Sequence, residues 1–328
     1  MNDTFLFPDF PRAILSLRGA DRVEFLHRLV SHDIKGLPVG QARPACLLDR
    51  QGKILFAALV HARPDEFLLE MDPGSLATAQ AQLERYRISE KVEWSDAADR
   101  FRILPLHGPA GAEILRAAWP ELRLPEQNLA HLPGPEGSPV RLIARWDLLG
   151  GLGIHLWVEP SRREEVLEKL SQGGKPFGLE AGAAELFHAL RIEAGVPWPG
   201  AEMTPEVILN ELGSEEWVSF TKGCFIGQEI VARIKYRAHP PRLLRGFFIE
   251  GTEVPPVPCP LYADMGAVGE RVVGLITSAC RSPALGRPIA LGFLQHELDA
   301  PLTIRGRSQG GQPQARIKCS LRSFEPAQ

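Results

Sequence analysis

One stretch of the chain, KGCFIGQEIVARIKYR at residues 222–237, combines residue types that suit thiol chemistry. Cys224 lies between two glycines, with Lys222 two positions before it. A cysteine reacts, or binds a metal, as its thiolate. A nearby lysine favours that anion, and so do the free N–H groups of a helix that we expect to begin near Phe225. Cys224 is therefore the first candidate for a functional residue.

The residues around this cysteine are suited to contact a bound partner. Gly223 and Gly227 carry no side chain that would crowd an approaching ligand. Gln228 and Glu229 can satisfy local donors or contact a bound molecule. Arg233 lies four residues after Glu229, which is the spacing of an ion pair on one face of a helix.

An inert thiol is the competing interpretation, because a free cysteine is more often a small buried hydrophobe. Lys235 and Arg237 likewise suit a solvated helix face better than a nucleic-acid site. The other cysteines suit packing or a loop: Cys46 in an apolar strand, Cys280 and Cys319 in expected barrel strands, and Cys259 in the turn-like PPVPCP. The five cysteines form no CxxC pair and the nine histidines no HxxxH or HExxH spacing, so no stably bound metal is predicted.

Composition limits the class of protein. The chain has 328 residues, of which 44% are hydrophobic and 23% charged, values typical of a globular protein with two or three domains. A net charge of −3 gives no general basic field, so we expect no direct nucleic-acid binding. The longest apolar run, Ile54–Val60, is far short of the ~20 residues of a membrane span. With no signal-like N-terminus, the sequence predicts a cytoplasmic protein without membrane contact.

The elements that must position the thiol follow from hydrophobic periodicity. A first series of strands and helices is expected at 13–17, 20–30, 46–49, 53–62, 66–71 and 75–86. The pattern then restarts, because SLRGADRVEFLHRL at 16–29 resembles PLHGPAGAEILRAA at 105–118. Strands at VRLIARW and IHLWVE, a hairpin turn at Gly150–Gly153 and a helix at Ser161–Leu170 follow. The series predict two facing α+β modules, near 1–98 and 99–175.

A third segment begins near Pro176 and contains a helix at Ala183–Ala194 that ends at GVPWPG. After Arg237 the chain consists of short apolar runs separated by glycine and proline. Evenly spaced short strands of this kind predict a small β-barrel or sandwich. We place the domain boundary near Pro240, which gives a first region at 1–240 and a barrel at 241–328.

The motif KGCFIGQE strongly resembles the signature K-G-C-[FY]-x-G-Q-E of the YgfZ family. These folate-binding proteins are linked to iron–sulfur cluster assembly or repair and to tRNA modification, and they are a branch of the aminomethyltransferase (glycine-cleavage T-protein) superfamily. Three further segments are similar to the superfamily's N-terminal element, folate pocket and C-terminal barrel: LRGADRVEFLHRLVSHDI, LRIEAGVPWPGAEM and GLITSACRSPALGRPIALGFL.

The resemblance implies an α+β, aminomethyltransferase-like folate-binding fold of two facing ferredoxin-like modules, a third segment and a C-terminal barrel. It implies tetrahydrofolate or a derivative as cofactor, and iron–sulfur client or assembly proteins as partners. The residues that fall on the signature or just after it are Lys222, Gly223, Cys224, Gly227, Gln228, Glu229 and Arg233. Cys224 and Lys222 become the catalytic candidates, and the others become candidates for folate binding.

Two further positions matter under this resemblance. Glu193 falls on the glutamate that hydrogen-bonds the pterin ring in true aminomethyltransferases, a task that suits a carboxylate. Without the resemblance it would be a solvated carboxylate at a helix end. Aminomethyltransferases also carry an Asp-Asp pair in a G-G-x-x-D-D segment. The matching segment here is GKILFA, which places Phe56 and Ala57 where the carboxylates would be. Neither can carry a proton, so we predict that aminomethyl transfer is lost.

Three functions stay open on the sequence. The first is a folate-binding accessory protein that assists iron–sulfur cluster assembly or repair, and thereby tRNA modification, through Cys224. The second is a folate-dependent aminomethyl or methyl transferase. The third is a scaffold that neither binds folate nor uses its thiol.

Overall fold

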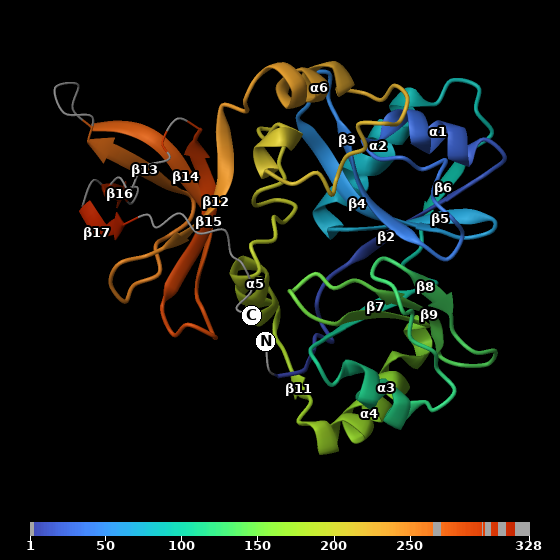
Figure 1. Cartoon of the computed structure of the whole chain (residues 1–328). Helices are drawn as coiled ribbons and strands as arrows, with labels where there is room; N and C mark the ends of the chain where they lie inside the picture. The colour runs from blue at the N-terminus through green and yellow to red at the C-terminus, as the bar shows by residue number, and fades with distance from the viewer. Residues whose placement is uncertain (1–2, 265–269, 297, 299–302, 308–312, 319–328) are drawn as a thin grey trace. The chain divides into compact units, whose positions relative to one another are not determined.

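The computed structural model describes residues 3–264, 270–296, 298, 303–307 and 313–318, the last two ranges by their backbone (Figure 1). The chain divides into two compact units. Unit 1 consists of Met1–Asp49, Leu55–Phe187 and Glu216–Ile226. Unit 2 consists of Arg50–Ile54, His188–Glu215 and Gly227–Gln328. Cys224 therefore belongs to unit 1, although the helix that follows it in the sequence belongs to unit 2.

The first sheet of unit 1 has five strands in the order β3-β4-β5-β2-β6. Its strands are β2 (Ala13–Arg18), β3 (Ala42–Leu48), β4 (Ile54–Ala62), β5 (Glu66–Met71) and β6 (Glu93–Asp96). Two helices accompany it, α1 (Arg22–Leu29) and α2 (Leu76–Tyr86), the latter preceded by the 3-10 turn η1 (Pro73–Ser75).

The second sheet of unit 1 has six strands in the order β11-β1-β7-β10-β9-β8. Its strands are β1 (Phe5–Leu6), β7 (Arg102–His107), β8 (His131–Pro133), β9 (Val140–Arg145), β10 (Gly153–Val158) and β11 (Glu180–Ala181). Its helices are α3 (Gly111–Ala118) and α4 (Arg163–Gly174), with 3-10 turns η2 (Pro160–Arg162) and η3 (Lys175–Phe177).

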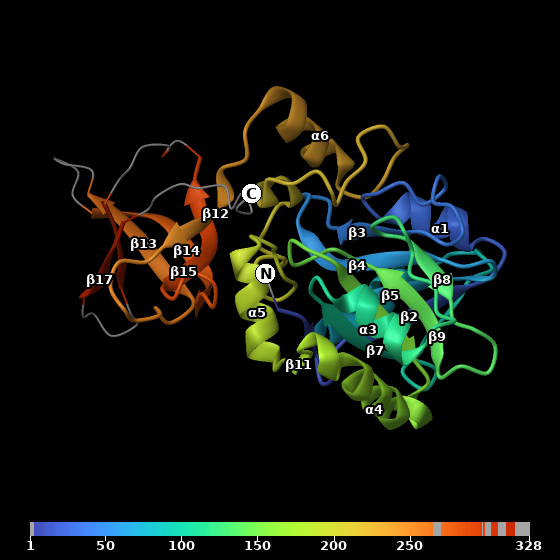
Figure 2. The ribbon, with the colours of Figure 1, turned by 60° about the horizontal axis from the view of Figure 1, so that its bottom comes forward.

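Each sheet buries both of its faces. Leu15 and Leu17 of β2 pack into one core with Phe25 of α1. Ile14, which points to the opposite face of the same strand, packs instead with Trp157 of the second sheet. The two sheets therefore face each other, with helices on their outer sides. Figure 1 shows α1 and α2 against the first sheet, and Figure 2 shows α3 and α4 together against the second.

A network of charged and polar side chains around Glu70 is also buried between the two sheets. The Glu70 carboxylate accepts from Nε of Arg12 at 2.9 Å, and it lies 2.9 Å from Nδ1 of His155 and 3.2 Å from Nε2 of His61. Glu70 and His61 have no exposed side-chain surface. Burial alone would raise the pKa of Glu70, but the charges of His155 and Arg12 and the hydrogen bonds hold it well below its usual value. Glu70 therefore stays a carboxylate, and its contact with His155 of β10 connects the two sheets.

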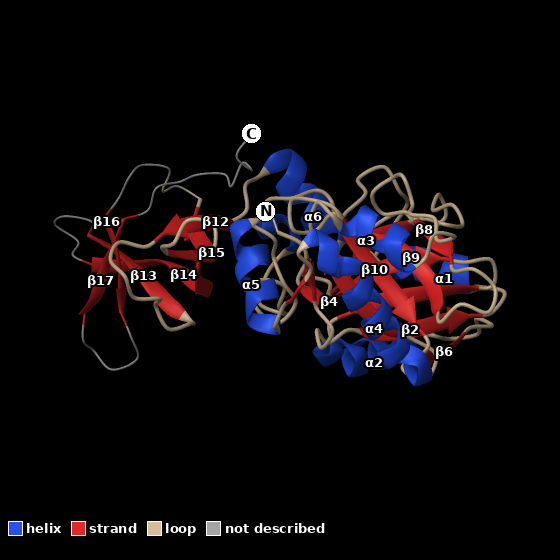
Figure 3. Ribbon diagram, turned by 90° about the horizontal axis from the view of Figure 1, so that it is seen from below, coloured by secondary structure: helices blue, strands red, loops and turns tan. Residues whose placement is uncertain are grey.

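Unit 2 contains a six-stranded antiparallel sheet in the order β12-β15-β14-β13-β16-β17 (Figure 3). Its strands are β12 (Arg242–Phe248), β13 (Cys259–Asp264), β14 (Glu270–Arg281), β15 (Pro288–Gln295), β16 (Thr303–Arg307) and β17 (Pro313–Lys318). The edge strands β12 and β17 approach each other, as in a small barrel. The other elements are α5 (Ala184–Glu193), which begins in unit 1, the 3-10 turn η4 (Leu209–Leu212) and α6 (Gln228–Arg237).

The α+β class predicted from the sequence is confirmed, and helices are present with shifted ends where the sequence predicts them at 20–30, 75–86, 161–170 and 183–194. The hairpin turn at Gly150–Gly153 is also present, between β9 and β10. The domain boundary near Pro240 stays a prediction. Cys319 lies outside the described residues.

Two local expectations are wrong. The helix after the cysteine begins at Gln228 and not near Phe225, because Gly227 takes a left-handed φ of 82° at its N-cap. Cys259 is not in a turn-like loop: it is the first residue of β13 and is only 1% exposed. Pairing of that strand with β14 overrides the local preference of its prolines for a loop.

Glu66 in β5 joins β2 to the chain after β6 by buried polar contacts. Its carboxylate accepts from Oγ of Ser16 at 2.7 Å, from Nε of Arg18 at 3.0 Å and from both terminal nitrogens of Arg100 at 2.7 and 2.9 Å. Burial would raise the pKa of Glu66, but the hydrogen bonds from Arg100 and Ser16 lower it to about 2.

A Glu66→Gln substitution tests this contact. A carboxyl group with a lowered folded-state pKa stabilises the protein above its unfolded pKa, and that stabilisation is lost as pH falls from about 4.5 towards 2. We expect the variant to lose roughly 1–3 kcal/mol of unfolding free energy at pH 7. The difference between the two proteins should shrink as pH falls from about 4.5, as measured by urea unfolding. A difference that is constant over this pH range would contradict the assignment.

Candidate functional site

Cys224 lies in the part of unit 1 formed by Glu216–Ile226, which we call the cysteine segment. Trp217 and Val218 at its beginning are buried, and Lys222 and Phe225 are buried on either side of the cysteine. Cys224 itself is exposed. A Cβ atom built on Gly223 would meet no heavy atom within 4 Å. The segment is therefore fixed at buried side chains and presents the thiol to solvent with open space beside it.

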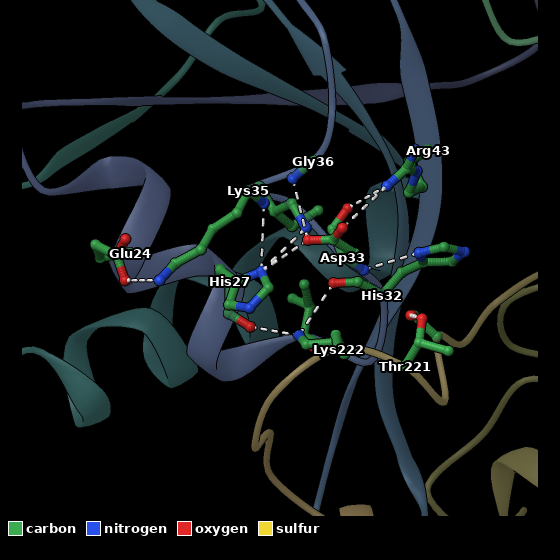
Figure 4. A network of polar contacts seen from close by, with 12 residues as sticks. Glu24, His27, His32, Asp33, Lys35, Gly36, Arg43, Thr221 and Lys222 are labelled. Atoms are coloured by element: carbon green, nitrogen blue, oxygen red, sulfur yellow. Dashed lines mark hydrogen bonds and ion pairs between the residues drawn. The ribbon is translucent and has the colours of Figure 1, made fainter.

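Lys222 has a defined set of acceptors. Its ammonium nitrogen donates to the main-chain carbonyls of His27 at 2.5 Å, Val30 at 2.6 Å and His32 at 3.0 Å. Figure 4 shows the side chain of Lys222 beside His27, in the last turn of α1, and His32, in the turn after the helix. Burial lowers the pKa of Lys222 to about 8, against the opposing charge of Asp33, so the ammonium form prevails at pH 7.

The remaining predicted residues lie in unit 2. Gly227 is the N-cap of α6 and its left-handed φ of 82° requires a glycine. Gln228 is half-buried in the first turn, whereas Glu229 and Arg233 are exposed. The predicted residues are thus divided between the units: Lys222, Gly223 and Cys224 in unit 1, and Glu193, Gly227, Gln228, Glu229 and Arg233 in unit 2.

Glu193, the last residue of α5, is half-buried and hydrogen-bonded. Its Oε1 accepts from the hydroxyl of Ser282 and from the backbone N–H of Ala284 at 2.9 Å. Both donors lie in the segment between β14 and β15. The carboxylate is therefore held in place within unit 2, which differs from a freely solvated helix-end group.

A buried ion pair that the sequence did not predict lies next to Glu193. Arg191 of α5 donates to Glu202 at 2.8 Å and to the Ser278 hydroxyl at 2.6 Å, and both charged side chains are nearly inaccessible. Glu202 also accepts from the N–H of Trp198 at 3.0 Å. The network fixes the loop after α5 to strand β14. The only signal for it was a charged residue, Arg191, between the apolar residues Leu190 and Ile192.

Phe56 and Ala57 are buried in β4, each with 2% exposure. Phe56 packs in the same core as Phe25 and Leu26 of α1. The positions at which the resemblance expects two carboxylates are therefore apolar and inaccessible to water. In the parts of the chain that the structure describes, no three His, Cys, Asp or Glu side chains are arranged to hold a metal ion. Within the same residues, no helix is long and apolar enough to cross a membrane.

Comparison with protein families identifies the class. A GCVT N-terminal domain matches residues 13–222, and a glycine cleavage T-protein C-terminal barrel domain matches residues 242–320. The chain belongs to the glycine cleavage T-protein family. It has the aminomethyltransferase-like fold, with an α+β N-terminal domain and a barrel-like C-terminal domain.

Individual relatives agree with this class. The chain is 30% identical over 298 residues to an aminomethyltransferase of Thermus thermophilus, with 89% of this chain and 80% of that protein covered. It is 29% identical over 297 residues to one of Streptomyces avermitilis, with 88% and 77% covered. The crystal structure of glycine cleavage system aminomethyltransferase T from Bartonella henselae matches with a TM-score of 0.82 at 20% identity. That match covers 98% of this chain and 86% of the other, and it shows the fold alone.

Selective alkylation tests the exposure of Cys224. Cys46 has no exposed surface and burial raises its pKa far above the usual range, while burial raises the pKa of Cys280 to about 11. We expect the native protein to be alkylated by iodoacetamide at pH 8 on Cys224 on the order of 100-fold faster than on Cys46, Cys259 or Cys280.

Peptide mapping by mass spectrometry gives the rate at each site, and it follows Cys319 separately. A Cys224→Ser variant is the control and should lose the fast phase. A rate at Cys46 or Cys280 equal to that at Cys224 would show that the thiol is not selectively presented.

Proposed function

We propose that this protein binds tetrahydrofolate or a derivative and acts as an accessory protein in iron–sulfur cluster assembly or repair, and thereby in tRNA modification. Cys224 is the working thiol, and iron–sulfur client or assembly proteins are its partners. The observation that carries the proposal is the contrast between two positions. The thiol of Cys224 is exposed, while Phe56 and Ala57, at the positions where the resemblance expects the transferase carboxylates, are buried.

Family membership supports folate binding, because the family's aminomethyltransferases use tetrahydrofolate. We assign Glu193 as the pterin-binding carboxylate. Its Oε1 is occupied by Ser282 and Ala284, which orients the group, and a carboxylate can accept further hydrogen bonds at its second oxygen. Gly223, Gly227, Gln228, Glu229 and Arg233 are assigned to the same ligand on their match to the cysteine signature.

A folate-dependent aminomethyltransferase is the second candidate. The relatives that carry this name, at 25–30% identity, favour it over the accessory role. The chemistry of the residues opposes it. Transfer needs a group that takes up or releases a proton at the reacting amine, and Phe56 and Ala57 have none. A scaffold that neither binds folate nor uses its thiol is the third candidate.

Calorimetry with tetrahydrofolate separates the scaffold from the other two. We expect binding by the wild-type protein and a loss of at least about tenfold in affinity for Glu193→Ala, since a hydrogen bond to a charged group contributes roughly 1.5–3 kcal/mol. Glu185→Ala, which removes an exposed carboxylate in the first turn of the same helix, is the matched control and should bind normally. Absence of heat and of a thermal shift at saturating ligand would favour the scaffold.

Turnover and complementation separate the accessory protein from the transferase. We expect the purified protein to form no methylenetetrahydrofolate from the aminomethylated carrier protein of glycine cleavage and tetrahydrofolate. We also expect Cys224→Ala to fail to restore iron–sulfur enzyme activity in a deletion strain in which the wild type restores it. Turnover would show that the protein is a transferase. Full restoration by Cys224→Ala would show that the function does not need the thiol.

A further inference from the structure

Lys222 meets three acceptors at once, and all three are main-chain oxygens. An ammonium group has three N–H donors, and the carbonyls of His27, Val30 and His32 account for each of them. The nitrogen also lies 5.1 Å from the centre of the Phe225 ring, within the range of a cation–π contact. Every donor of the ammonium is therefore directed into unit 1 at main-chain groups.

Two of these oxygens belong to the end of a helix. Helix α1 ends at Leu29 with Val30 as its C-cap, and His27 is in its last turn. The last carbonyls of a helix have no partner within the helix, and they carry the negative end of its dipole. A lysine that donates to them completes the helix end. In this case the lysine comes from a segment 190 or more positions further along the chain.

A second set of contacts holds the same two segments together. The hydroxyl of Ser31 donates to the carbonyl of Trp217 at 2.5 Å, and the N–H of Ser219 donates to the carbonyl of Ser31 at 3.0 Å. The Ser31 hydroxyl also accepts from the N–H of Cys46 in β3 at 2.9 Å. The cysteine segment is thus attached to the chain between α1 and β3 from Trp217 to Lys222, directly before Cys224.

The ionisable side chains around Lys222 have hydrogen-bond or ion-pair partners of their own, although the charge of Asp33 opposes the effect of burial on the pKa of Lys222. Burial lowers the pKa of His27, and burial together with Arg43 lowers the pKa of His32 to about 4, so both rings are neutral at pH 7. Asp33 accepts from the N–H of Gly36 at 3.1 Å and lies 3.9 Å from Arg43. Lys35 pairs with Glu24 at 2.6 Å, away from the buried ammonium (Figure 4).

We infer that Lys222 is a positioning residue: its ammonium attaches the cysteine segment to the end of α1 and thereby fixes where Cys224 is presented. This role differs from the one expected from the spacing of Lys222 and Cys224, in which the lysine stabilises the thiolate. The importance of the attachment for activity rests on the proposed function of Cys224. The attachment itself is a property of unit 1 and can be measured without folate or clusters.

Lys222→Met, which keeps the length of the side chain and removes its donors, tests the inference in the full-length protein. Hydrogen exchange should become about tenfold faster in peptides that cover 216–226 and 27–32. The pH midpoint for alkylation of Cys224 should stay within about 0.3 units of the wild type, because a positioning residue does not set the thiol's pKa. Lys175→Met, at an exposed lysine of unit 1, is the matched control and should change neither measurement.

Two results would overturn the inference. An unchanged rate of hydrogen exchange at 216–226 in Lys222→Met would show that Lys222 does not attach the cysteine segment. A rise of about one unit or more in the alkylation midpoint would show that Lys222 acts on the thiolate. If Lys222→Met does not fold, Ser31→Ala takes its place, since it removes the hydroxyl that binds the carbonyl of Trp217 and the N–H of Cys46. We expect faster exchange at 216–226 there too, and no change would count against the attachment.

Complementation separates this inference from the proposed function. If both hold, Lys222→Met should lower restoration of iron–sulfur enzyme activity at least several-fold while the protein remains folded and Cys224 remains reactive. Faster exchange with full restoration would support the attachment and reject its link to activity.

Discussion

Burial of both faces of the two sheets in unit 1 is the constraint on which the site depends. Alternate residues of β2 pack outward against α1 and inward against the second sheet, so neither face can tolerate a shift in register. The inner surface includes the Glu70 network, which stays favourable only while Arg12, His61 and His155 surround the carboxylate. These contacts fix α1 on the outer side of the first sheet, and the end of α1 then supplies two of the three carbonyls that accept from Lys222.

The exposure of Cys224 follows from what holds its neighbours. The cysteine segment is anchored by buried side chains on both sides of Cys224, namely Trp217, Val218, Lys222 and Phe225. Cys224 is therefore exposed on a backbone that its neighbours hold in place. A thiol in such a place can meet a protein partner or a small ligand without unfolding of the core. The buried cysteines Cys46 and Cys259 have the ordinary packing role of this residue type.

Membership of the glycine cleavage T-protein family and the apolar residues in β4 point in different directions for activity. The fold is that of the aminomethyltransferases, and the carboxylate of Glu193 is held in place by Ser282 and Ala284. At Phe56 and Ala57, however, the side chains contribute to the core and carry no titratable group. A fold can keep a ligand-binding arrangement while the groups for chemistry change, since function depends on the site and not on the fold.

The sequence by itself determined the α+β class, the main helices and strands, and the choice of Cys224 as the candidate thiol, because periodicity and local motifs carry that information. It also places Phe56 and Ala57, which carry no carboxylate, where the resemblance expects an Asp-Asp pair. Only the tertiary structure decided what Lys222 contacts and which cysteines are buried, and it alone placed the Glu70 and Arg191–Glu202 networks in the interior. Each of these residues has a partner far away in the sequence, 195 positions for Lys222 and His27, 85 for Glu70 and His155 and 87 for Arg191 and Ser278, and no local pattern encodes such a pairing. Helix α6 begins at Gln228 and not near Phe225 for a local reason that residue spacing did not reveal, which is the left-handed backbone of Gly227.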